Sequence, residues 1–434
     1  MLEVYGVVAN VFYGVFSNAL KVFLFVWWAV VPVGLFLIFL KIRLIYLRTK
    51  FTESIKWKLF EIKVPKDILK TPKAMEQVIA GLYASYSYGP NWMKIYLEGA
   101  VEPWFSLEVA GYSGGAYFYI YGPADKQNVI ESAIYSQYPD AEIKEADDYT
   151  ELAPAALPNE VFDLFAGELI LARESFYPIK VYHYFESVVE EQRLDPIAML
   201  IETMSKLKEG EKVWFQILIS PTGSLTGNNW KKEGEEKIAE IIGKAKGKKP
   251  GLGDEFNAWF RNFFWAPVEV PSWPSEKKPE QFLKFLSPDE QDLVKEIANK
   301  ISKLGFEAFI RFVYIDDKDR FTGDNVTAIM GALHQFSHYN SFKPLFLTRY
   351  DTLFSKIVPS YKKWRTNYRK KRIFDYYKKR RFGIYNKTRP EKFPVFSNEE
   401  LATLYHLPVT MVEAPKLRRQ EFKKGGPPPN LPIE

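Results

Sequence analysis

The chain has 434 residues, of which 47 % are hydrophobic and 26 % charged, a balance typical of globular proteins that excludes wholesale disorder. It contains no cysteine, which excludes disulfides, thiolate catalysis, iron–sulfur clusters and cysteine-bound zinc. The net charge is only +6, so the distribution of charge along the chain is more informative than its sum.

The first predicted element is a membrane span at residues 22–40, within an anchor region of residues 1–50. These 19 residues carry no charge, and a helix over them is about 28 Å long, close to the thickness of the hydrocarbon core of a bilayer. A cleaved signal peptide is the alternative, but it has a shorter apolar run and a small-residue cleavage site. Large and charged residues follow the apolar run here, which favours a retained span over a signal peptide.

Basic residues set the expected orientation of this single span. Only Glu3 and Lys21 are charged on its N-terminal side. Four basic residues follow it, namely Lys41, Arg43, Arg48 and Lys50. By the positive-inside rule, the C-terminal body lies in the cytoplasm, attached to the inner membrane. Residues 1–20 are apolar and either lie in the membrane interface or pack against another membrane helix.

The body is predicted to be α+β, and residues 51–150 are predicted to form a first ferredoxin-like domain. The expected elements are a strand at 56–64, a helix from Thr71-Pro72, two strands flanking the turn at 111–115, a helix at 125–138 and a strand at 141–145. Their order is β-α-β-β-α-β, which is the ferredoxin-like plan.

Residues 151–358 are predicted to repeat this plan as a second ferredoxin-like domain. The expected elements are a strand at 180–186, a helix at 195–208, a strand at 213–220, a helix after the capping box Ser287–Glu290 and a strand at 306–315. An insertion at residues 231–285 interrupts this domain. Its aromatic cluster either contacts a membrane or partner, or packs onto the domain itself.

A basic aromatic segment is expected at residues 359–397, and it is predicted to be helical. Residues 361–392 contain 14 Lys or Arg and only two acidic residues, a net charge of +12. Such a charge favours contact with nucleic-acid phosphates, or with an anionic leaflet at about 1 kcal/mol per basic residue. A solvated helix face is the alternative. The residues expected to bind are Lys370, Lys371, Arg372, Lys378, Lys379, Arg380 and Arg381.

The sequence indicates no catalytic, cofactor-binding or metal-binding residues, and we expect no enzyme. The phosphate-binding motif GxxxxGK[ST] does not occur. His334 and His338 are four residues apart, but Gln335 stands where a zincin needs Glu, so ordinary packing is favoured over a metal site. The acidic residues at 316–324 lack the Gly and the terminal Glu of a calcium loop.

Several stretches resemble the N-terminal, non-catalytic region of membrane-associated, DNA-pumping ATPases of the conjugation and type IV secretion group (the HerA/FtsK-like group). They are KTPKAMEQV at 70–78, YPDAEI at 138–143, the run from LDPIAML to ISP at 194–221, and NEELATLYHLP at 398–408, with PPPNLP near the end. In those ATPases the last segment leads into the nucleotide-binding domain. The ATP-binding residues of the group have no counterparts in this chain, so the resemblance implies a separate P-loop ATPase subunit.

The resemblance therefore implies a non-enzymatic scaffold of a transfer machine, which recruits that ATPase through a docking segment and linker at 398–434. The expected docking residues are Leu401, Leu404, Tyr405 and Leu407, on the premise that they are exposed. The alternative is that this segment folds back onto its own domain.

A second functional hypothesis is a membrane-tethered nucleic-acid-binding protein that acts through residues 361–392. The expected partners are the lipid bilayer and the ATPase subunit. DNA and a second copy of this chain remain open as further partners.

Overall fold

The computed structural model describes residues 2–63, 70–85, 93–102, 104–186, 194–222, 229–243, 286–349, 357–381 and 393–408, with side chains from residue 27 onward except residue 29. These residues divide into two compact units, which are described separately. The first unit comprises residues 1–56 and 87–102, and the second comprises residues 57–86 and 103–434.

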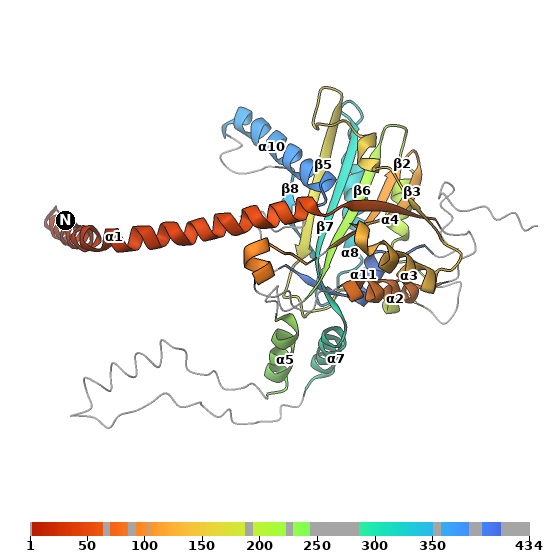
Figure 1. The fold of residues 1–434 in the computed structure, drawn as a ribbon, viewed down its shortest axis with the longest axis horizontal. Helices are drawn as coiled ribbons and strands as arrows, with labels where there is room; N and C mark the ends of the chain where they lie inside the picture. Colours follow the sequence, from red (N-terminus) through yellow and green to blue (C-terminus); the bar gives the residue numbers. More distant parts are fainter. Residues whose placement is uncertain are drawn as a thin grey trace, which may run out of the picture. The chain divides into compact units, whose positions relative to one another are not determined.

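The first unit is built on one long helix, α1 (Leu2–Ser54), which contains Pro32 (Figure 1). Its part Val30–Ser54 is long and apolar enough to cross a membrane, and none of its apolar window is buried inside the protein. A core helix of a soluble protein buries such a stretch, so this exposure argues against a core role. The prediction of one apolar N-terminal helix is confirmed.

A single π-helical turn, η2 (Lys94–Glu98), lies beside α1 in the first unit. It ends at Gly99, which has a φ of 74°. A Cβ atom at Gly99 would lie 2.4 Å from the carbonyl carbon of Leu47, so both the backbone conformation and the close approach require glycine.

The second unit is organised around one antiparallel sheet, in which the described residues supply nine strands (Figure 1). The strands are β1 (Trp57–Lys63), β2 (Phe105–Tyr112), β3 (Gly115–Pro123), β4 (Glu142–Glu145), β5 (Phe162–Leu171), β6 (Lys212–Pro221), β7 (Gly305–Asp317), β8 (Phe342–Leu347) and β9 (Val395–Ser397). Their order is β4-β1-β3-β2-β6-β7-β5-β8, and β9 pairs with the start of β7. Both predicted domains thus contribute strands to one sheet, because β2 pairs with β6.

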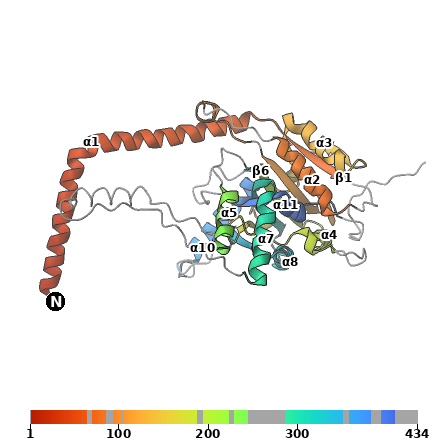
Figure 2. The same ribbon diagram turned by 90° about the horizontal axis from the view of Figure 1, so that it is seen from below.

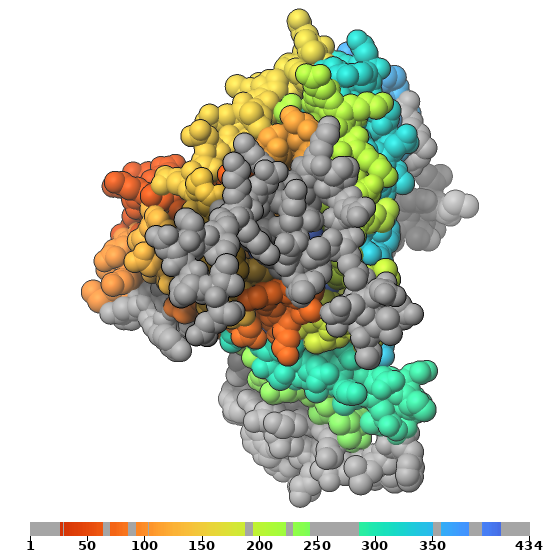
Figure 3. Space-filling view, turned by 90° about the vertical axis from the view of Figure 1, so that its right-hand side faces the viewer, coloured from red at the N-terminus to blue at the C-terminus, as the bar shows by residue number. Residues whose placement is uncertain are grey.

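Helices cover both faces of this sheet. They are α2 (Pro72–Leu82), α3 (Gln127–Gln137), α4 (Ala198–Ser205), α5 (Trp230–Ile241), α7 (Pro288–Ser302), α8 (Asp324–His334), α10 (Pro359–Lys378) and α11 (Asn398–Leu404). The larger hydrophobic core joins α2, α3, α4, α8 and α11 to one face, and Figures 1 and 2 show α2, α3, α4 and α11 together on that side. A smaller core joins α10 and the one-turn helix η4 (Tyr149–Leu152) to the opposite face. Helices α5 and α7 pair at one end of the unit (Figures 1 and 3).

Local sequence explains most of the elements in residues 57–145. Thr71 is the N-cap residue of α2 and Pro72 is its first helical residue, as predicted, although the Thr71 side chain makes no capping hydrogen bond. The apolar residues of α2, Met75, Val78, Ile79 and Leu82, are buried on one face. Ser113 and Gly114 have φ values of 51° and 69°, the left-handed conformations that a two-residue hairpin turn requires.

The predicted strand at 180–186 is wrong. This segment is irregular and contains the 3-10 turn η5 (Tyr182–Tyr184). Tyr182 N–H donates to Thr403 Oγ1 of α11, and Lys180 N–H donates to the carbonyl oxygen of Phe336, so these donors are not used in a strand ladder. Just before the segment, Ile179 N–H donates to Glu400 Oε1. The first strand of this half of the sheet is β5, which the sequence patterns did not predict.

Parts of several predictions lie outside the described residues. These parts are residues 244–285 of the insertion with their aromatic cluster, residues 382–392 of the basic segment, and the linker at 409–434.

Candidate functional site

Four polar side chains form a row across the centre of the sheet, on the face that α10 covers. Glu108, Gln216, Arg311 and Glu168 lie on the adjacent strands β2, β6, β7 and β5, each opposite the next. Gln216 Nε2 donates to Glu108 Oε1 at 2.9 Å, and Arg311 Nε donates to Glu168 Oε1 at 2.7 Å. All four side chains are buried, and the row holds two carboxylates for one guanidinium. An unpaired buried charge is strongly unfavourable, so a second cation is needed.

Arg380, two residues after the end of α10, supplies this cation. Its Nε donates to Glu108 Oε1 at 2.8 Å and its Nη1 donates to Asp148 Oδ2 at 2.6 Å, while only 1 % of the residue is exposed. Burial opposes the charge of Arg380, but Glu108 and Asp148 outweigh it and raise the arginine pKa well above its usual value. Burial also opposes the charge of Asp148, yet the hydrogen bonds and charge of Arg380 lower the aspartate pKa. The arginine therefore remains a buried cation.

The backbone at the end of α10 is held by the same row. Arg311 Nη1 donates to the carbonyl oxygen of Tyr376 in the last turn of α10 at 3.4 Å, and Arg311 Nη2 donates to the carbonyl oxygen of Arg381, just after the helix, at 2.7 Å. Tyr149 OH donates to Glu108 Oε2 at 2.8 Å and accepts from Tyr377 OH at 2.8 Å. Helix C-termini present unpaired carbonyl groups with a partial negative charge, which a buried guanidinium satisfies well. The C-terminal end of α10 is therefore fixed to the centre of the sheet.

One face of α10 changes character along the helix. Its C-terminal half buries Ile373, Phe374 and Tyr377 against the sheet. At helical spacing, the same face of the N-terminal half carries Lys363 and Lys370 instead. Lysines at these positions prevent the N-terminal half from packing as the C-terminal half does.

A groove of about 460 Å³ opens at this N-terminal half, between α10 and the loops beside β5 and β7. Lys318, Lys362, Lys363 and Lys370 line it together with Asp163 and several amide and hydroxyl groups. Lys370 Nζ contacts both carboxylate oxygens of Asp163, at 2.6 and 2.7 Å. With four lysines and one aspartate, the lining is positively charged and suits an anionic ligand such as a phosphate group.

A family model described as "Domain of unknown function (DUF8128)" matches residues 47–420. The chain belongs to this family. The DUF8128 match covers the second unit as far as residue 420, including its sheet, α10 and the groove, so these features belong to the family region of the chain. Comparison with curated proteins finds no match.

The seven basic residues predicted to bind nucleic acid or lipid have different environments in this DUF8128 fold. The guanidinium of Arg380 is buried among carboxylates, so it is not exposed on the surface of this structure. Of the seven, Lys370 lines the groove. Lys378 donates to the carbonyl oxygen of Ala155 at 2.7 Å, and Lys379 pairs with Asp375 at 2.6 Å.

Of the other three predicted residues, two are on the surface of α10 or just after it, and Arg372 is partly buried beside Glu168 and Phe346. Lys371 and Arg381 are exposed, and Arg372 Nε donates to Tyr376 OH at 3.2 Å. Sequence reasoning missed Lys318, which follows β7, and no sequence signal connects it to α10. Lys362 and Lys363 could have been predicted to join Lys370, because helical spacing places all three on the same side of α10.

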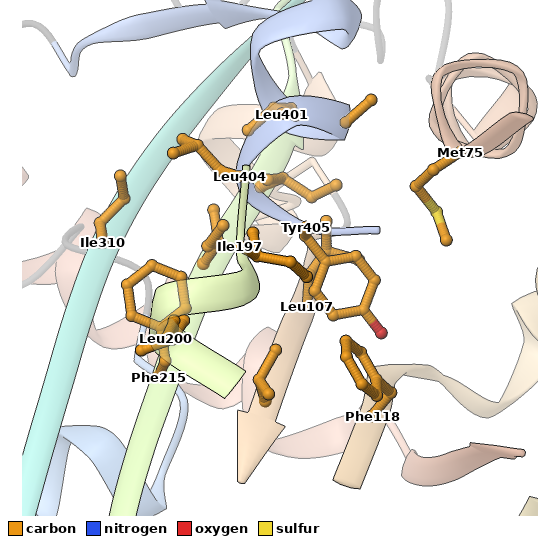
Figure 4. Close-up of a cluster of buried hydrophobic side chains, with 14 of the residues drawn as sticks. Met75, Leu107, Phe118, Ile197, Leu200, Phe215, Ile310, Leu401, Leu404 and Tyr405 are labelled. Atoms are coloured by element: carbon orange, nitrogen blue, oxygen red, sulfur yellow. The ribbon is translucent and has the colours of Figure 1, made fainter. Parts of the chain in front are cut away.

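The predicted docking residues are core residues in this DUF8128 member. Leu401, Leu404, Tyr405 and Leu407 are 0–1 % exposed and lie among side chains of the sheet and helices, as Figure 4 shows for the first three. Tyr405 OH donates to the carbonyl oxygen of Tyr119 at 3.0 Å. The premise that they are exposed is wrong, and the alternative that the segment folds back onto its own domain is observed.

Buried polar contacts explain why this segment folds inward. Ser397 and Glu400 form a capping box at the start of α11. Glu400 also pairs with buried Lys300 of α7 at 2.9 Å. Burial is the main influence on Lys300 and lowers its pKa, whereas Glu400 opposes this shift.

Three of the four histidines contact aromatic rings or carboxylates: His338 contacts aromatic rings, and His183 and His406 lie beside carboxylates. Within the part of the chain that the structure describes, no group of three or more His, Asp or Glu side chains is placed to hold a metal ion. The ring of His338 contacts the rings of Tyr184 and Tyr339. Buried His406 lies with Nε2 3.1 Å from Asp195 Oδ1.

Proposed function

We propose that this DUF8128 protein is a membrane-anchored, non-enzymatic component of a conjugation- or type IV secretion-like transfer machine, which holds a nucleic-acid strand in the lysine-lined groove of α10. The observation that carries the proposal is the combination, on one chain, of an exposed apolar helix and a positively charged groove. The first suits lipid and the second suits a polyanion.

The membrane location is supported by α1. Its apolar side chains are exposed over a length that matches a bilayer core, and basic residues cluster on its C-terminal side. In this proposal the helix is a single span of the inner membrane and the second unit lies in the cytoplasm.

The shape of the groove favours a nucleic-acid strand over a lipid surface. A planar leaflet meets protruding side chains first, whereas Lys370 is largely buried and contacts Asp163 within the groove, on the face of α10 that turns toward the body of the protein. A flexible strand of phosphates can enter a recess of this size and exchange its counterions for lysines.

Charge reversal in the groove tests the proposal. Lys318→Glu combined with Lys363→Glu should weaken binding of a single-stranded oligonucleotide by the full-length protein at least tenfold at low salt. It should also reduce the slope of log affinity against log salt by about 1.4, since each phosphate contact contributes about 0.7 for single strands. Fluorescence anisotropy in nanodiscs of zwitterionic lipid measures both quantities.

Lys144→Glu combined with Lys206→Glu is the matched control, because it changes the charge equally at exposed positions outside the groove. The proposal is wrong if the two double variants lose affinity equally, or if the unmodified protein binds no oligonucleotide at low salt.

The ATPase partner rests on the sequence resemblance. Since Leu401 and its neighbours are core residues, docking in this proposal falls to the Pro-rich residues beyond 408, which lie outside the described residues. Recovery of a P-loop ATPase with the full-length protein from membranes would support this part, and its absence would count against it.

We also infer that the sheet consists of two ferredoxin-like halves. The half β4-β1-β3-β2 and the half β8-β5-β7-β6 have the same internal strand order, and each has a helix between its first and second strands and another between its third and fourth, as in the β-α-β-β-α-β plan. In the second half, α5 and α7 are additional helices between β6 and β7. The halves meet where β2 pairs with β6. Glu108 and Gln216, which belong to the row that holds α10, face each other at this junction.

A further inference from the structure

The first unit exposes apolar side chains on η2 as well as on α1. Tyr96 is 57 % exposed and Leu97 is 48 % exposed. Both are large, and burying such side chains away from water is favourable by about 1.5–3 kcal/mol each. Their exposure on a one-turn helix therefore calls for an apolar environment that the described protein does not supply.

The position of η2 along α1 is fixed. Gly99 allows the end of η2 to approach the backbone of α1 at Leu47, and the Ala100 N–H closes the turn by donating to the carbonyl oxygen of Lys94 at 3.0 Å. Leu47 lies seven residues beyond Leu40, where the uncharged run ends, which is about 10 Å along the helix axis.

This distance along the helix axis is shortened along the bilayer normal by the usual tilt of a membrane helix, and it places Leu47 at the outer edge of the head-group region. A hydrocarbon core of about 30 Å within a total of about 40–45 Å leaves roughly 5–8 Å for each interfacial layer. Exposed Ile42, Ile45 and Tyr46 continue the apolar surface of α1 from Leu40 to the level of η2. Tyrosines with lysines nearby are typical of this layer, because both combine an apolar body with a polar end.

We propose that η2 is a second membrane contact. It inserts Tyr96 and Leu97 into the head-group region of the leaflet at the C-terminal end of the proposed span. The inference rests on the proposed membrane anchoring of α1. A single span can rotate about its axis and change its tilt, whereas a second contact beside it restricts both movements. The occupant of this surface is thus lipid, continuous with the lipid around α1.

The absence of cysteine from the sequence makes a direct test practical, because one introduced thiol is the only labelling site. Leu97→Cys in the full-length protein is labelled with an environment-sensitive fluorophore and reconstituted in nanodiscs. Quenching is measured with lipids that carry a nitroxide either near the head group or deep in the chain. Tyr96→Cys provides a second position, in case one substitution disturbs η2.

Two reference positions separate the possible outcomes. Leu35→Cys, five residues before the end of the uncharged run, reports on the span, and Lys206→Cys, at a side chain 73 % exposed in the second unit, reports on solvent. We expect shallow nitroxides to quench the probes at 96 and 97 at least twofold more than the probe at 206. We expect deep nitroxides to quench the probe at 35 most strongly.

The inference is overturned if the probes at 96 and 97 are quenched no more than the probe at 206 while the probe at 35 is quenched. In that case the proposed anchor stands and η2 is not part of it. If the probe at 35 is also unquenched, the proposed anchor itself is wrong.

Discussion

Arg380 lies in the most basic stretch of the chain, yet its guanidinium contacts protein carboxylates. The reason is found 272 residues earlier, where Glu108 is buried in the middle of β2. A charge in that position needs an opposite charge and hydrogen bonds, and Gln216 supplies only one neutral donor. The local sequence around Arg380 contains no sign of this requirement.

The residue scale yields a stability prediction for Glu108. Glu108→Ala removes the carboxylate between Arg380, Tyr149 and Gln216, and leaves a buried guanidinium with Asp148 as its remaining carboxylate. We expect a loss of about 3–5 kcal/mol in the free energy of unfolding, typical for breaking a buried ion pair. Denaturant titration of the full-length protein in detergent, followed by tryptophan fluorescence, measures this loss.

Glu145→Ala is the control at the residue scale. Glu145 pairs with Lys58 on an exposed edge strand, and such surface pairs contribute about 0–1 kcal/mol. Equal losses for the two variants would show that the buried row does not hold α10.

At the scale of elements, α10 shows how one helix serves two roles. Its apolar C-terminal half packs against the sheet, and its basic N-terminal half lines a groove. Composition predicted a basic segment with interleaved aromatics. It did not predict which lysines share the groove, because Lys318 and Asp163 come from distant strands that only the folded sheet brings to α10.

Helix α11 provides the prediction at this scale. Leu404→Ala should reduce the free energy of unfolding by about 2–5 kcal/mol, because a fully buried leucine is replaced and a cavity remains. Leu152→Ala is the control, since Leu152 is exposed and should change stability by less than about 0.5 kcal/mol. Thermal unfolding followed by circular dichroism compares the two variants. Unchanged stability for Leu404→Ala would reopen the docking role of this segment.

At the scale of the whole molecule, the second unit joins two halves that the sequence suggests as separate domains. Eight residues of β2 pair with β6, and one hydrophobic core contains side chains from both halves, such as Phe60 and Ile310. Separate domains have their own cores and few contacts between them. Because the core is continuous, we expect the two halves to unfold cooperatively.

The corresponding prediction concerns the number of unfolding transitions. Residues 57–408 should unfold in one transition, with coincident curves from tryptophan fluorescence and far-ultraviolet circular dichroism. Two separated transitions would contradict this expectation and support independent domains with a boundary near residue 150.

The sequence by itself determined the local features of this protein. Uncharged length identified the apolar N-terminal helix, and hydrophobic periodicity identified β1 to β4, α2 and α3, because these patterns depend on residues within a few positions of each other. The Ser287–Glu290 capping box was equally visible, since it is closed by residues three apart.

Only the tertiary structure decided which side chains are buried and which are brought together. The burial of α11, the pairing of Arg380 with Glu108, the irregular course of residues 180–186 and the lining of the groove all depend on partners far apart in the chain. Apolar and charged residues have the same local sequence signature whether they meet solvent or protein. Their environment is fixed only when the sheet closes and distant segments compete for the same buried donors and acceptors.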